Sequence, residues 1–326
     1  MLSERVLYLL EQNRGKLVTG GELAKQLDVS RTAIWKAVRA LREDGSEIEA
    51  LPNSGYRLLP ESDGLSGQSI HDMLATENFG RSMELLESVA STNQYLKGLD
   101  TASLGEGYTV VADGQTSGRG RLGRPFYSPA REGVYLSVLL KPAIPLAETA
   151  FLTICAAVAV CRAVEAVCGV KTGIKWVNDI YVAGKKLCGI LTEAFISAEM
   201  QSVDYAVAGI GINTGDIPAE VEDTATSIYA AAGVRGIRNR LIAQLLNQFE
   251  GVYTDYTVRG KKREILEEYA GRLFIIGREV EVSAPGGVCT ATVLGVNDSG
   301  GLMVKRRDGE IIHLGAGEIK ITDWER

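Results

Sequence analysis

The sequence predicts an α+β fold made of three successive units. Residues 1–62 combine helical periodicity with one hairpin pattern, residues 63–272 mix apolar strands with helices, and residues 273–326 are short strands separated by glycine turns. Hydrophobic periodicity is the primary signal for secondary structure, and the composition changes near both boundaries. At 326 residues, the chain is long enough for two or three domains with cores of their own.

Composition and charge exclude several functional classes. Hydrophobic residues make up 45% of the chain and charged residues 23%, as in an ordinary soluble globular protein. The net charge of −6 means that any contact with nucleic acid must be local. The longest uncharged apolar run, residues 150–161, is too short to span a bilayer, and no secretion signal opens the chain. We therefore expect a cytoplasmic protein that makes no use of a membrane.

Cysteines and histidines argue against a redox or metal centre. The five cysteines include no Cys-x-x-Cys pair, and three of them lie in an apolar helical segment where buried free thiols are the default. The only histidines, His71 and His313, are far apart in sequence, which disfavours a Ser-His-Asp triad and a histidine-rich metal site. We expect free cysteines in a reducing compartment and no metal ligands from the protein.

The first unit begins with two short helices. Residues 3–12 predict the first of them. Thr19 and Glu22 have the spacing of a capping box, in which the hydroxyl and the carboxylate satisfy free amides at a helix start. The helix after this box is predicted to be short and to cover residues 23–27.

A third helix carries the basic charge of this unit. Ser30 can cap it, and it is predicted to run to Glu43, with one buried face formed by Ile34, Ala37, Val38 and Leu41. Residues 30–43 hold four basic residues and one acid, a net charge of +3, whereas residues 1–60 hold nine and eight, a net charge of +1. The residues of this helix that we expect to contact DNA are Ser30, Arg31, Thr32, Lys36, Arg39 and Arg42.

A predicted hairpin completes the pattern of a winged helix-turn-helix. Residues 48–51 and 56–59 alternate as strands around a Pro-Asn-Ser-Gly turn at 52–55. Winged helices also dock proteins, and in that interpretation Trp35 packs on the fold. We favour DNA as the partner, because the basic residues lie on the helix that can enter a major groove. Residues 61–67, polar and rich in Gly and Ser, are expected to form a linker.

The stretch QTSGRGRLGR, residues 115–124, is the most informative part of the middle unit; we call it the arginine loop. It holds three glycines, three arginines and no acidic residue. Glycine lets the backbone approach a ligand closely, and arginine offers a fork of donors, so a loop with both predicts closure over a phosphate or carboxylate. A solvated basic surface loop is the alternative.

The same glycines satisfy the Gly-x-Gly-x-x-Gly pattern of dinucleotide sites. That pattern requires a strand before it and a helix opening within it. A strand is predicted at residues 108–112, but the loop is succeeded by a proline-containing segment and an extended run at residues 134–140. Without a helix at this point, we do not expect a dinucleotide fold.

Further polar groups interrupt the apolar segments of the middle unit. Ser91, Thr92 and Asn93 lie where a helix is predicted to begin, and taken alone they are best explained as helix caps. A predicted strand at residues 174–182 is interrupted by Lys175, Asn178 and Asp179. Such groups inside a strand cost desolvation energy unless they are paired or used.

Two more segments complete the middle unit. Residues 184–191 predict a hairpin turn leading into a strand that carries Lys186 and Gly189, and residues 206–211 form another apolar run that continues to Asn213. Residues 214–236 are rich in small residues and are expected to form a mobile flap.

Four blocks of these residues, in this order, identify a family. They are STNQ (91–94), GRGRLGR (118–124), KWVND (175–179) and KKLCGIL (185–191). The chain resembles, over essentially its full length, the bifunctional biotin–protein ligases that double as repressors of the biotin operon. The resemblance implies a class II synthetase-like ligase domain in the middle. Lipoate ligases share that fold, but their Arg-Arg-x-x-Gly-Gly-Gly block is absent here.

Two positions depart from the family pattern. The family usually has Lys-Trp-Pro-Asn-Asp, and Val177 replaces the proline in this chain. A tryptophan commonly comes after the arginine loop, and Phe126 stands in its place. Both changes leave the polar ligand contacts intact.

The resemblance implies a two-step reaction. Biotin and ATP give biotinyl-5′-AMP and pyrophosphate, and biotin then passes to a lysine of the biotin carboxyl carrier protein domain of acetyl-CoA carboxylase. Cations must screen the carboxylate and the phosphate as they meet. Arg119, Arg121 and Lys186 are expected to do this, Asp179 to orient the incoming amine, and Mg²⁺ to share the charge of the departing pyrophosphate.

The family's ligand contacts fall on identifiable positions of this chain. For biotin they are Ser91, Thr92, Asn93, Gln115, Arg119, Gly120, Arg121, Lys186 and Gly189. For ATP and the adenylate they are Gly118, Arg119, Arg121, Lys175, Asn178 and Asn213.

The resemblance also implies a regulatory role. The adenylate is expected to order the central loops and to promote a homodimer that spans two half-sites of operator DNA. One alternative is a ligand-sensing repressor with an inactive ligase domain, and another is a ligase whose winged helix is vestigial. Lipoate or octanoate as the acid is a further alternative.

The last unit is predicted to be a small barrel. Short strands are expected at residues 279–282, 290–296, 303–306 and 310–314, with turns at 285–287, 297–301 and 308–309. In the family this SH3-like barrel assists the binding of ATP and of the carrier. A purely stabilising cap is the alternative.

Overall fold

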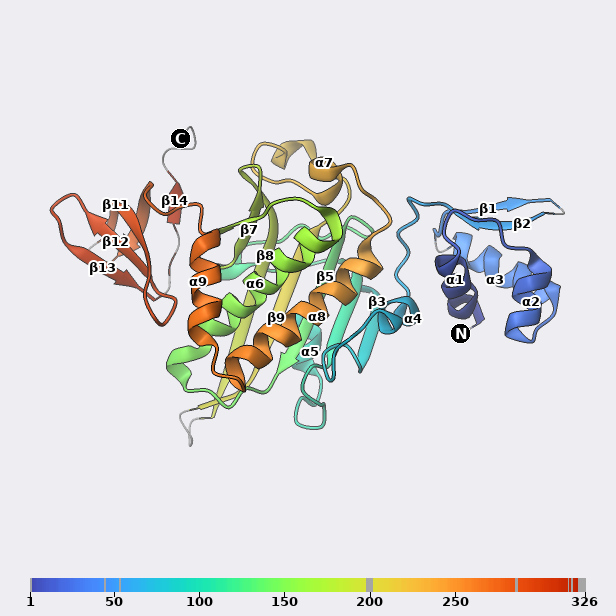
Figure 1. Cartoon of the computed structure of the whole chain (residues 1–326), viewed down its shortest axis with the longest axis horizontal. Coiled ribbons are helices and arrows are strands. Elements are labelled where there is room, and N and C mark those ends of the chain that lie inside the picture. Colours follow the sequence, from blue (N-terminus) through green and yellow to red (C-terminus); the bar gives the residue numbers. More distant parts are fainter. Residues whose placement is uncertain are drawn as a thin grey trace.

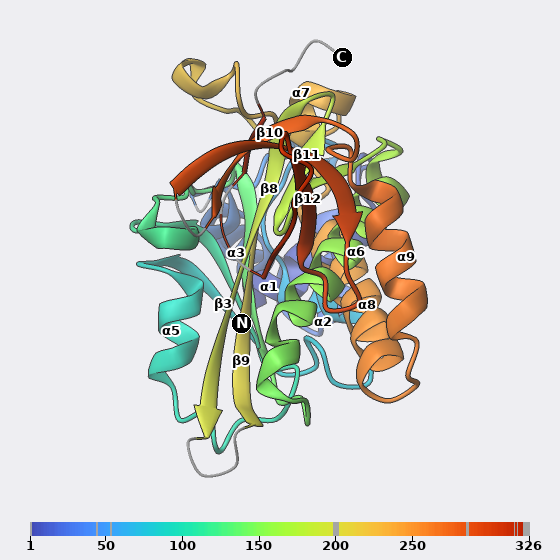
Figure 2. The ribbon, with the colours of Figure 1, turned by 90° about the vertical axis from the view of Figure 1, so that its left-hand side faces the viewer.

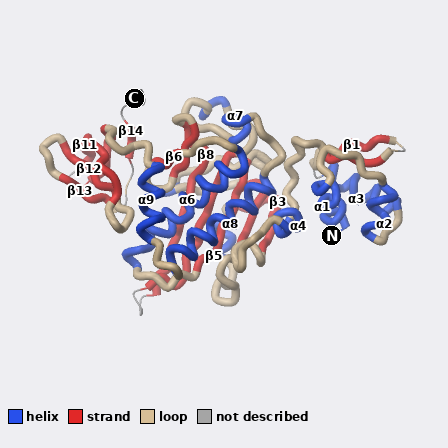
Figure 3. Tube along the Cα trace, in the orientation of Figure 1, coloured by secondary structure: helices blue, strands red, loops and turns tan. Residues whose placement is uncertain are grey.

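The computed structural model describes residues 2–43, 45–52, 54–197, 202–284, 287–315, 317 and 319–321. Three units succeed one another along the long axis of the molecule (Figure 1): a helical head, a central sheet covered by helices, and a small sheet at the other end. The predicted α+β fold is thereby confirmed. Figure 3 shows the contrast between the units, because the head is helical apart from its hairpin whereas the last unit consists of strands and loops.

The head contains three helices and a hairpin, as predicted. Its elements are α1 (Leu2–Gln12), α2 (Gly20–Leu27), α3 (Arg31–Glu43), β1 (Ile48–Leu51) and β2 (Gly55–Leu58). The capping box is confirmed, since the Thr19 hydroxyl accepts from the Glu22 amide at 3.1 Å and the Glu22 carboxylate accepts from the Thr19 amide at 2.8 Å. Because Thr19 is itself the cap, α2 begins three residues earlier than predicted. In the predicted wing turn, residue 53 lies outside the described residues.

The central sheet has seven strands in the order β3-β4-β5-β9-β8-β7-β6. β3 pairs with β4 in parallel, and every other neighbouring pair is antiparallel. The strands are β3 (Met83–Val89), β4 (Thr109–Gln115), β5 (Gly133–Leu140), β6 (Gly173–Lys175), β7 (Asp179–Val182), β8 (Lys185–Ser197) and β9 (Ser202–Asn213). β5 is buried along its whole length, so the sheet is covered on both faces there.

Helices cover the sheet unequally (Figure 2). α6, α8 and α9 lie on one face, and α5 lies on the other, against β4, β5 and β9. The helices of this unit are α4 (Gly67–Asp72), α5 (Thr92–Gly98), α6 (Thr149–Cys168), α7 (Ile228–Ala232), α8 (Arg238–Thr257) and α9 (Lys262–Arg272). Three short 3-10 turns accompany them: η1 (Arg121–Gly123), η2 (Leu146–Glu148) and η3 (Ala219–Val221). The arginine loop, which contains η1, leads into a strand, as the sequence predicts.

The apolar run around α6 is longer than the sequence analysis found. Residues Leu146–Cys168 have a mean hydropathy of 2.0 over their most apolar window and are long enough to cross a membrane by length and composition alone. In the structure, 67% of that window is buried, and α6 packs against α8, α9 and β8. The core helix of a globular domain passes the same test. Cys155, Cys161 and Cys168 lie on this helix, and all five cysteines are free, as predicted.

The single strand predicted at residues 174–182 is wrong. Residues 174–182 form two strands, β6 and β7, that fold back on each other and pair Lys175 with Asp179. The intervening turn is held from outside the hairpin. The Trp176 indole donates to the Gly300 carbonyl at 3.0 Å, and the Tyr269 hydroxyl donates to the Val177 carbonyl at 2.9 Å. These partners come from segments too distant in sequence for a local pattern to reveal.

The last unit is an antiparallel sheet of five strands in the order β13-β12-β11-β10-β14. Its strands are β10 (Glu279–Ala284), β11 (Gly287–Val296), β12 (Leu302–Arg306), β13 (Ile311–Leu314) and β14 (Ile319–Ile321). The four predicted strands are confirmed, and β14 was missed because it has only three residues. The predicted turn at 285–287 includes residues 285 and 286, which lie outside the described residues.

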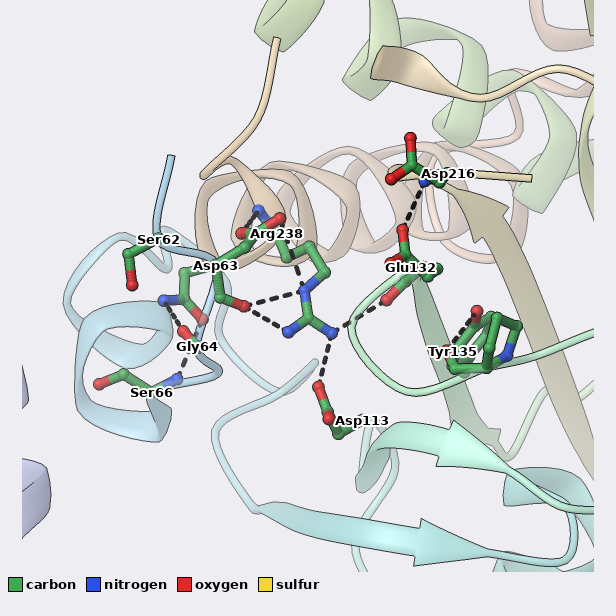
Figure 4. A network of polar contacts seen from close by, with 12 residues as sticks. Ser62, Asp63, Gly64, Ser66, Asp113, Glu132, Tyr135, Asp216 and Arg238 are labelled. Atoms are coloured by element: carbon green, nitrogen blue, oxygen red, sulfur yellow. Dashed lines mark hydrogen bonds and ion pairs between the residues drawn. The ribbon is translucent and has the colours of Figure 1, made fainter. Parts of the chain in front are cut away.

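The predicted linker between the head and the central unit is attached to the central unit by buried polar contacts. Ser62 and Ser66 are buried, and the carboxylate of Asp63 lies 3.6 Å from the guanidinium of the fully buried Arg238 (Figure 4). Arg238 also pairs with Asp113 at 2.7 Å. Burial raises the pKa of Asp63, while the charge of Arg238 opposes that rise. Polar composition here reflects buried ion pairs rather than exposure.

We expect Arg238→Met to lower the free energy of unfolding by about 3 kcal/mol, because it leaves two mostly buried carboxylates without their cation. Arg235→Met is the matched control, since the Arg235–Asp216 pair is much more exposed than the Arg238 pairs and surface pairs contribute about 0–1 kcal/mol. Urea denaturation followed by circular dichroism measures both values. Equal losses in the two variants would contradict this account of the buried pair.

Candidate functional site

A cavity of about 490 Å³ lies between the central sheet, the arginine loop and the last unit. It gathers most of the residues that the sequence predicts for ligand binding. Those that line it are Ser91, Thr92, Asn93, Gln115, Arg119, Gly120, Arg121, Lys175, Asn178, Asp179, Lys186 and Gly189. Segments separated by almost a hundred residues therefore converge on one site.

Two predicted ligand residues do not line the cavity. The Gly118 carbonyl accepts from the Phe126 amide at 2.8 Å, and a Cβ at Gly118 would lie 2.4 Å from the Phe126 carbonyl oxygen. Asn213 ends β9, and its amide donates to the Thr226 carbonyl at 3.0 Å. Gly118 thus helps to fix the arginine loop, and Asn213 connects β9 to the segment 214–236.

The helix α5 is capped differently from the prediction. Ser91 is its N-cap residue, but the Ser91 side chain makes no capping hydrogen bond. Instead, the Thr92 amide donates to the Gln115 side-chain oxygen at 2.8 Å, and the Gln115 amide donates to the Ser128 hydroxyl at 2.9 Å. Capping by Gln115 ties the start of α5 to the end of β4. Because the Ser91 hydroxyl makes no capping hydrogen bond, it is available to a ligand in the cavity that it lines.

The side-chain amide of Asn93 is fixed by hydrogen bonds to the sheet. Its amide nitrogen donates to the Leu191 carbonyl at 3.1 Å and to the Glu193 carboxylate at 2.8 Å. Its oxygen lies 2.6 Å from the Ser137 hydroxyl. A Cβ at Gly209 would lie 2.1 Å from that oxygen, so only glycine fits opposite it. The chain thus uses a buried amide and a glycine to form the floor of the cavity.

Phe126 forms an aromatic wall that the sequence analysis did not assign to the site. Gly189 and Gly211 are direct cross-strand partners in β8 and β9. A Cβ would lie 3.2 Å from the Phe126 ring at Gly189 and 2.4 Å from it at Gly211. The missing side chains make room for the ring on the sheet surface. The pairing of these two glycines follows from the register of β8 and β9, which the sequence alone does not reveal.

The cavity concentrates positive charge. Six basic side chains (Arg119, Arg121, Arg124, Lys175, Lys186 and Lys320) and two acidic ones (Asp179 and Glu281) line it, a net charge of +4 in a chain of net charge −6. Arg, with its rigid fork of donors, suits phosphate and carboxylate groups. The arrangement therefore favours an anionic ligand.

Each of the main cations is already oriented. Lys186 lies 2.7 Å from the Asp179 carboxylate. Arg121 donates to the Asn178 side-chain oxygen at 3.1 Å and to the Gly317 carbonyl at 3.0 Å. Neutral partners fix the position of Arg121 without cancelling its charge. The Asn178 amide in turn donates to the Ile190 carbonyl at 2.8 Å.

Arg119 lines the cavity, and the segment 214–236 contacts one of the strands that line it. The Arg119 guanidinium lies 2.8 Å from the Gln94 amide in the orientation in which the amide oxygen accepts. The Lys186 amide donates to the Thr224 carbonyl at 2.9 Å, and the Thr226 amide donates to the Lys186 carbonyl at 2.8 Å. The predicted flap thus contacts the strand that carries Lys186; its mobility stays a prediction.

A cysteine in this region is not a nucleophile. Cys188 belongs to the KKLCGIL block, but burial raises the pKa of its thiol well above the ordinary value. The thiolate would be needed for attack on a ligand. The chemistry of the site therefore depends on its charged and amide groups.

The last unit supplies one wall of the cavity. It contributes Glu281, Val282, Val288, Gly317, Ile319 and Lys320. The contact of Arg121 with Gly317 joins the arginine loop to this unit directly. Nothing in the sequence distinguishes these residues, because most of them lie in strands with an ordinary alternation of side chains.

The six residues predicted to contact DNA all lie on the exposed side of α3 or at its start. They are Ser30, Arg31, Thr32, Lys36, Arg39 and Arg42, and each is exposed. The expected buried face is also confirmed. Trp35 is 51% exposed. The alternative in which Trp35 packs on the fold therefore leaves about half of its surface unexplained.

Comparison with protein families divides the chain in the same way. Residues 3–57 match the helix-turn-helix domain model, residues 85–213 match the biotin/lipoate A/B protein ligase family, and residues 275–321 match the biotin protein ligase C-terminal domain.

Known proteins resemble most or nearly all of the chain. The bifunctional ligase/repressor BirA of Bacillus subtilis is 37% identical over 314 residues, covering 94% of this chain and 95% of that protein. The biotin–[acetyl-CoA-carboxylase] ligase of Mycobacterium tuberculosis is 31% identical, covering 77% of this chain and 96% of that protein. The structure of the Aquifex aeolicus biotin protein ligase in complex with biotin and ATP superposes with a TM-score of 0.63 at 30% identity, covering 74% of this chain and 98% of that one.

Proposed function

This chain belongs to the family of biotin protein ligases that also carry a repressor's helix-turn-helix head, and on this premise we propose which residues perform its two activities. It is a biotin–protein ligase and a transcriptional repressor. We place the boundaries of its three units at 62/63 and 272/273. The last helix of the central unit ends at Arg272, which supports the second boundary.

The ligase reaction joins two anions, and the charge of the cavity supports this chemistry. A biotin carboxylate oxygen attacks the α-phosphorus of ATP, the bond to the β-phosphate oxygen breaks, and pyrophosphate leaves. A lysine amine of the carrier protein then attacks the biotinyl carbonyl and releases AMP. The six cations of the cavity lower the repulsion between carboxylate and phosphate in the first step.

Biotin binds, in our proposal, in the part of the cavity next to α5 and the paired glycines. Ser91, Thr92, Asn93 and Gln115 supply its polar lining, with the backbones of Gly120 and Gly189 nearby. The Phe126 ring offers an apolar wall for a bicyclic ligand. Because this ring occupies a recess between strands, phenylalanine can serve where the family commonly has tryptophan.

The nucleotide and the adenylate lie, in our proposal, toward the turn at residues 176–178 and the last unit. Arg119, Arg121 and Lys186 contact the carboxylate and phosphate groups, and Lys175 and Asn178 contact the nucleotide. Gly118 and Asn213 act indirectly, through the shape of the segments that they hold. The wall formed by Val282, Val288 and Ile319 supports a part for the last unit in nucleotide binding.

Mg²⁺ enters, in our proposal, with ATP rather than through a site of the protein. Among the residues that the structure describes, no group of three or more His, Cys, Asp or Glu side chains could hold a metal ion. Mg²⁺ is commonly held by one or two carboxylates together with substrate phosphates. When bound, it shares the charge of the pyrophosphate.

Asp179 has two successive roles in our proposal. In the structure its carboxylate lies 2.7 Å from Lys186 and fixes that side chain in the cavity. Once the phosphate of the adenylate attracts Lys186, the carboxylate is released from this pair. It can then accept a hydrogen bond from the incoming lysine amine and orient it for attack.

The ligase activity is tested by ATP–pyrophosphate exchange on the purified protein. We expect exchange with biotin and none with lipoate. Lys186→Met should slow exchange by about 10²–10³-fold, because a cation at the developing charge is lost. Lys185→Met is the matched control: its side chain points away, to the Glu222 carbonyl, and exchange should persist. Lipoate-only exchange would make this a lipoate ligase, and no exchange would favour the sensor with an inactive ligase domain.

Asp179→Asn tests the transfer step. With preformed biotinyl-adenylate, single-turnover transfer to the carrier domain should slow by about 10²-fold, since the amine loses its acceptor. The affinity for biotin, measured by calorimetry, should change far less, because the amide keeps the size of the side chain. Equal effects on transfer and on biotin affinity would argue against this role.

The repressor function acts, in our proposal, through α3 and a homodimer. The exposed basic residues of α3 bind operator DNA, and the adenylate promotes a dimer that spans two half-sites. The carrier protein and the operator are the two macromolecular partners, and we place the protein in the cytoplasm. Binding at both sites by one chain lets the biotin supply control transcription.

A gel-shift experiment tests the link between ligand and DNA. On DNA from upstream of the host's biotin-synthesis genes, biotin with ATP should raise the affinity of the wild type by about 5–150-fold. Lys186→Met, which forms little adenylate, should show little of this increase, while Lys185→Met behaves as the wild type. Operator binding that is unaffected by biotin and ATP would rule out the coupling.

A further inference from the structure

Trp35 has a position that the buried core of the head does not explain. It lies on α3 and is 51% exposed, whereas Ile34, Ala37, Val38 and Leu41 of the same helix are buried. A large aromatic side chain normally buries its surface, and exposed aromatic surface marks interaction sites. Trp35 is not part of the buried core of the head, and its exposed surface is available to a partner.

The neighbours of Trp35 along the helix are basic. Arg31 and Arg39 stand four residues before and after it, so the three side chains lie along one stripe of α3. The Arg39 guanidinium lies 5.8 Å from the centre of the Trp35 ring. Arg31 packs beside Gly21, where a Cβ would lie 3.0 Å from its guanidinium. An aromatic ring flanked by two arginines on one helix face suits a negatively charged partner with flat apolar groups.

Trp35 also borders a groove of about 600 Å³ between α3, the start of α2 and the hairpin. Leu51 and Ser54 of the hairpin stand on its opposite side. The head that carries this groove lies at the opposite end of the molecule from the last unit (Figure 1). A partner that lies along α3 therefore meets the Trp35 ring and the hairpin together.

We propose that Trp35 is a specificity-determining residue that contacts the methyl group of a thymine in the major groove of duplex DNA. The thymine methyl is the one apolar group on a base edge in that groove, and aromatic side chains contact it readily. Arg31 and Arg39 flank the ring and are placed for phosphates or for guanine edges. This inference rests on the proposed repressor function and names one element of the sequence that the repressor recognises.

The basic surroundings favour DNA over a protein as the partner of this surface. The exposed residues of α3 beside Trp35 are basic or neutral, and the one acid of the helix, Glu43, pairs with Arg39 at 2.8 Å at the far end. Tryptophan and arginine occur at protein interfaces too, but lysine is depleted there, and charged residues are depleted at the interface centre. This face of the helix exposes four basic residues, Arg31, Lys36, Arg39 and Arg42, and such a cluster is typical of a nucleic-acid surface.

Selection from a random duplex library tests the proposal with the full-length protein, in the presence of biotin and ATP. Wild type, Trp35→Ala, Trp35→Phe and Lys36→Ala are compared, and circular dichroism checks that each head is folded. Wild type and Trp35→Phe should enrich the same motif, and Trp35→Ala should lose only a thymine from each half-site. Lys36→Ala is the control for a phosphate contact, and it should weaken all sequences without changing the motif.

Replacing the selected thymine by uracil removes the methyl group alone. The affinity of the wild type should fall about fourfold, the factor expected for one buried methyl group, and that of Trp35→Ala should not change. An unchanged motif in Trp35→Ala, or a wild type indifferent to uracil, overturns the proposal and leaves the repressor function intact. Should Trp35→Ala fail to fold, the uracil result on the wild type decides alone. A wild type that enriches no motif overturns both.

Discussion

The buried ion pairs of Arg238 join the parts of this protein on which both activities depend. Arg238 stands at the start of α8 and takes one carboxylate from the linker, Asp63, and one from β4, Asp113 (Figure 4). A buried carboxylate without a cation costs desolvation free energy. Asp63 therefore holds the linker next to Arg238. The next residue of α8, Asn239, continues the attachment, because it bonds to the backbone of Gly64 and Ser66.

The position of β4 then determines the ligand site. Gln115, two residues beyond Asp113, caps α5 and fixes the side chains at its start. The arginine loop leaves β4 at the same point and reaches the last unit through Arg121. A loop this rich in glycine needs such anchors, since its backbone is costly to order. Neutral anchors hold the arginines in place and leave the cavity with its excess of positive charge.

The family resemblance pointed to most of the polar residues that line the cavity. On their own, Ser91, Thr92 and Asn93 were best explained as helix caps, whereas Lys175, Asn178 and Asp179 stand out in an apolar segment. The sequence could not identify the Phe126 wall, which depends on two glycines meeting across strands. It missed the hairpin at 176–178, since Gly300 and Tyr269 hold that turn from distant segments. Both of these failures concern contacts between residues far apart in the chain. The sequence also left open whether Trp35 packs on the fold, because the exposure of a side chain on a helix surface depends on the tertiary structure.

The route from the ligand to the DNA head is short in this fold. The connection between β4 and β5 contains the arginine loop and, a few residues later, Arg131, whose guanidinium donates to the Gly45 carbonyl at 3.2 Å. Gly45 lies just beyond the end of α3, and a Cβ there would overlap the guanidinium at 1.6 Å. One connection therefore touches both the cavity and the end of the recognition helix. A ligand that contacts the arginine loop therefore acts on a connection that is already bonded to the head. Coupling between the two sites requires that such a contact differ between the free and the bound state.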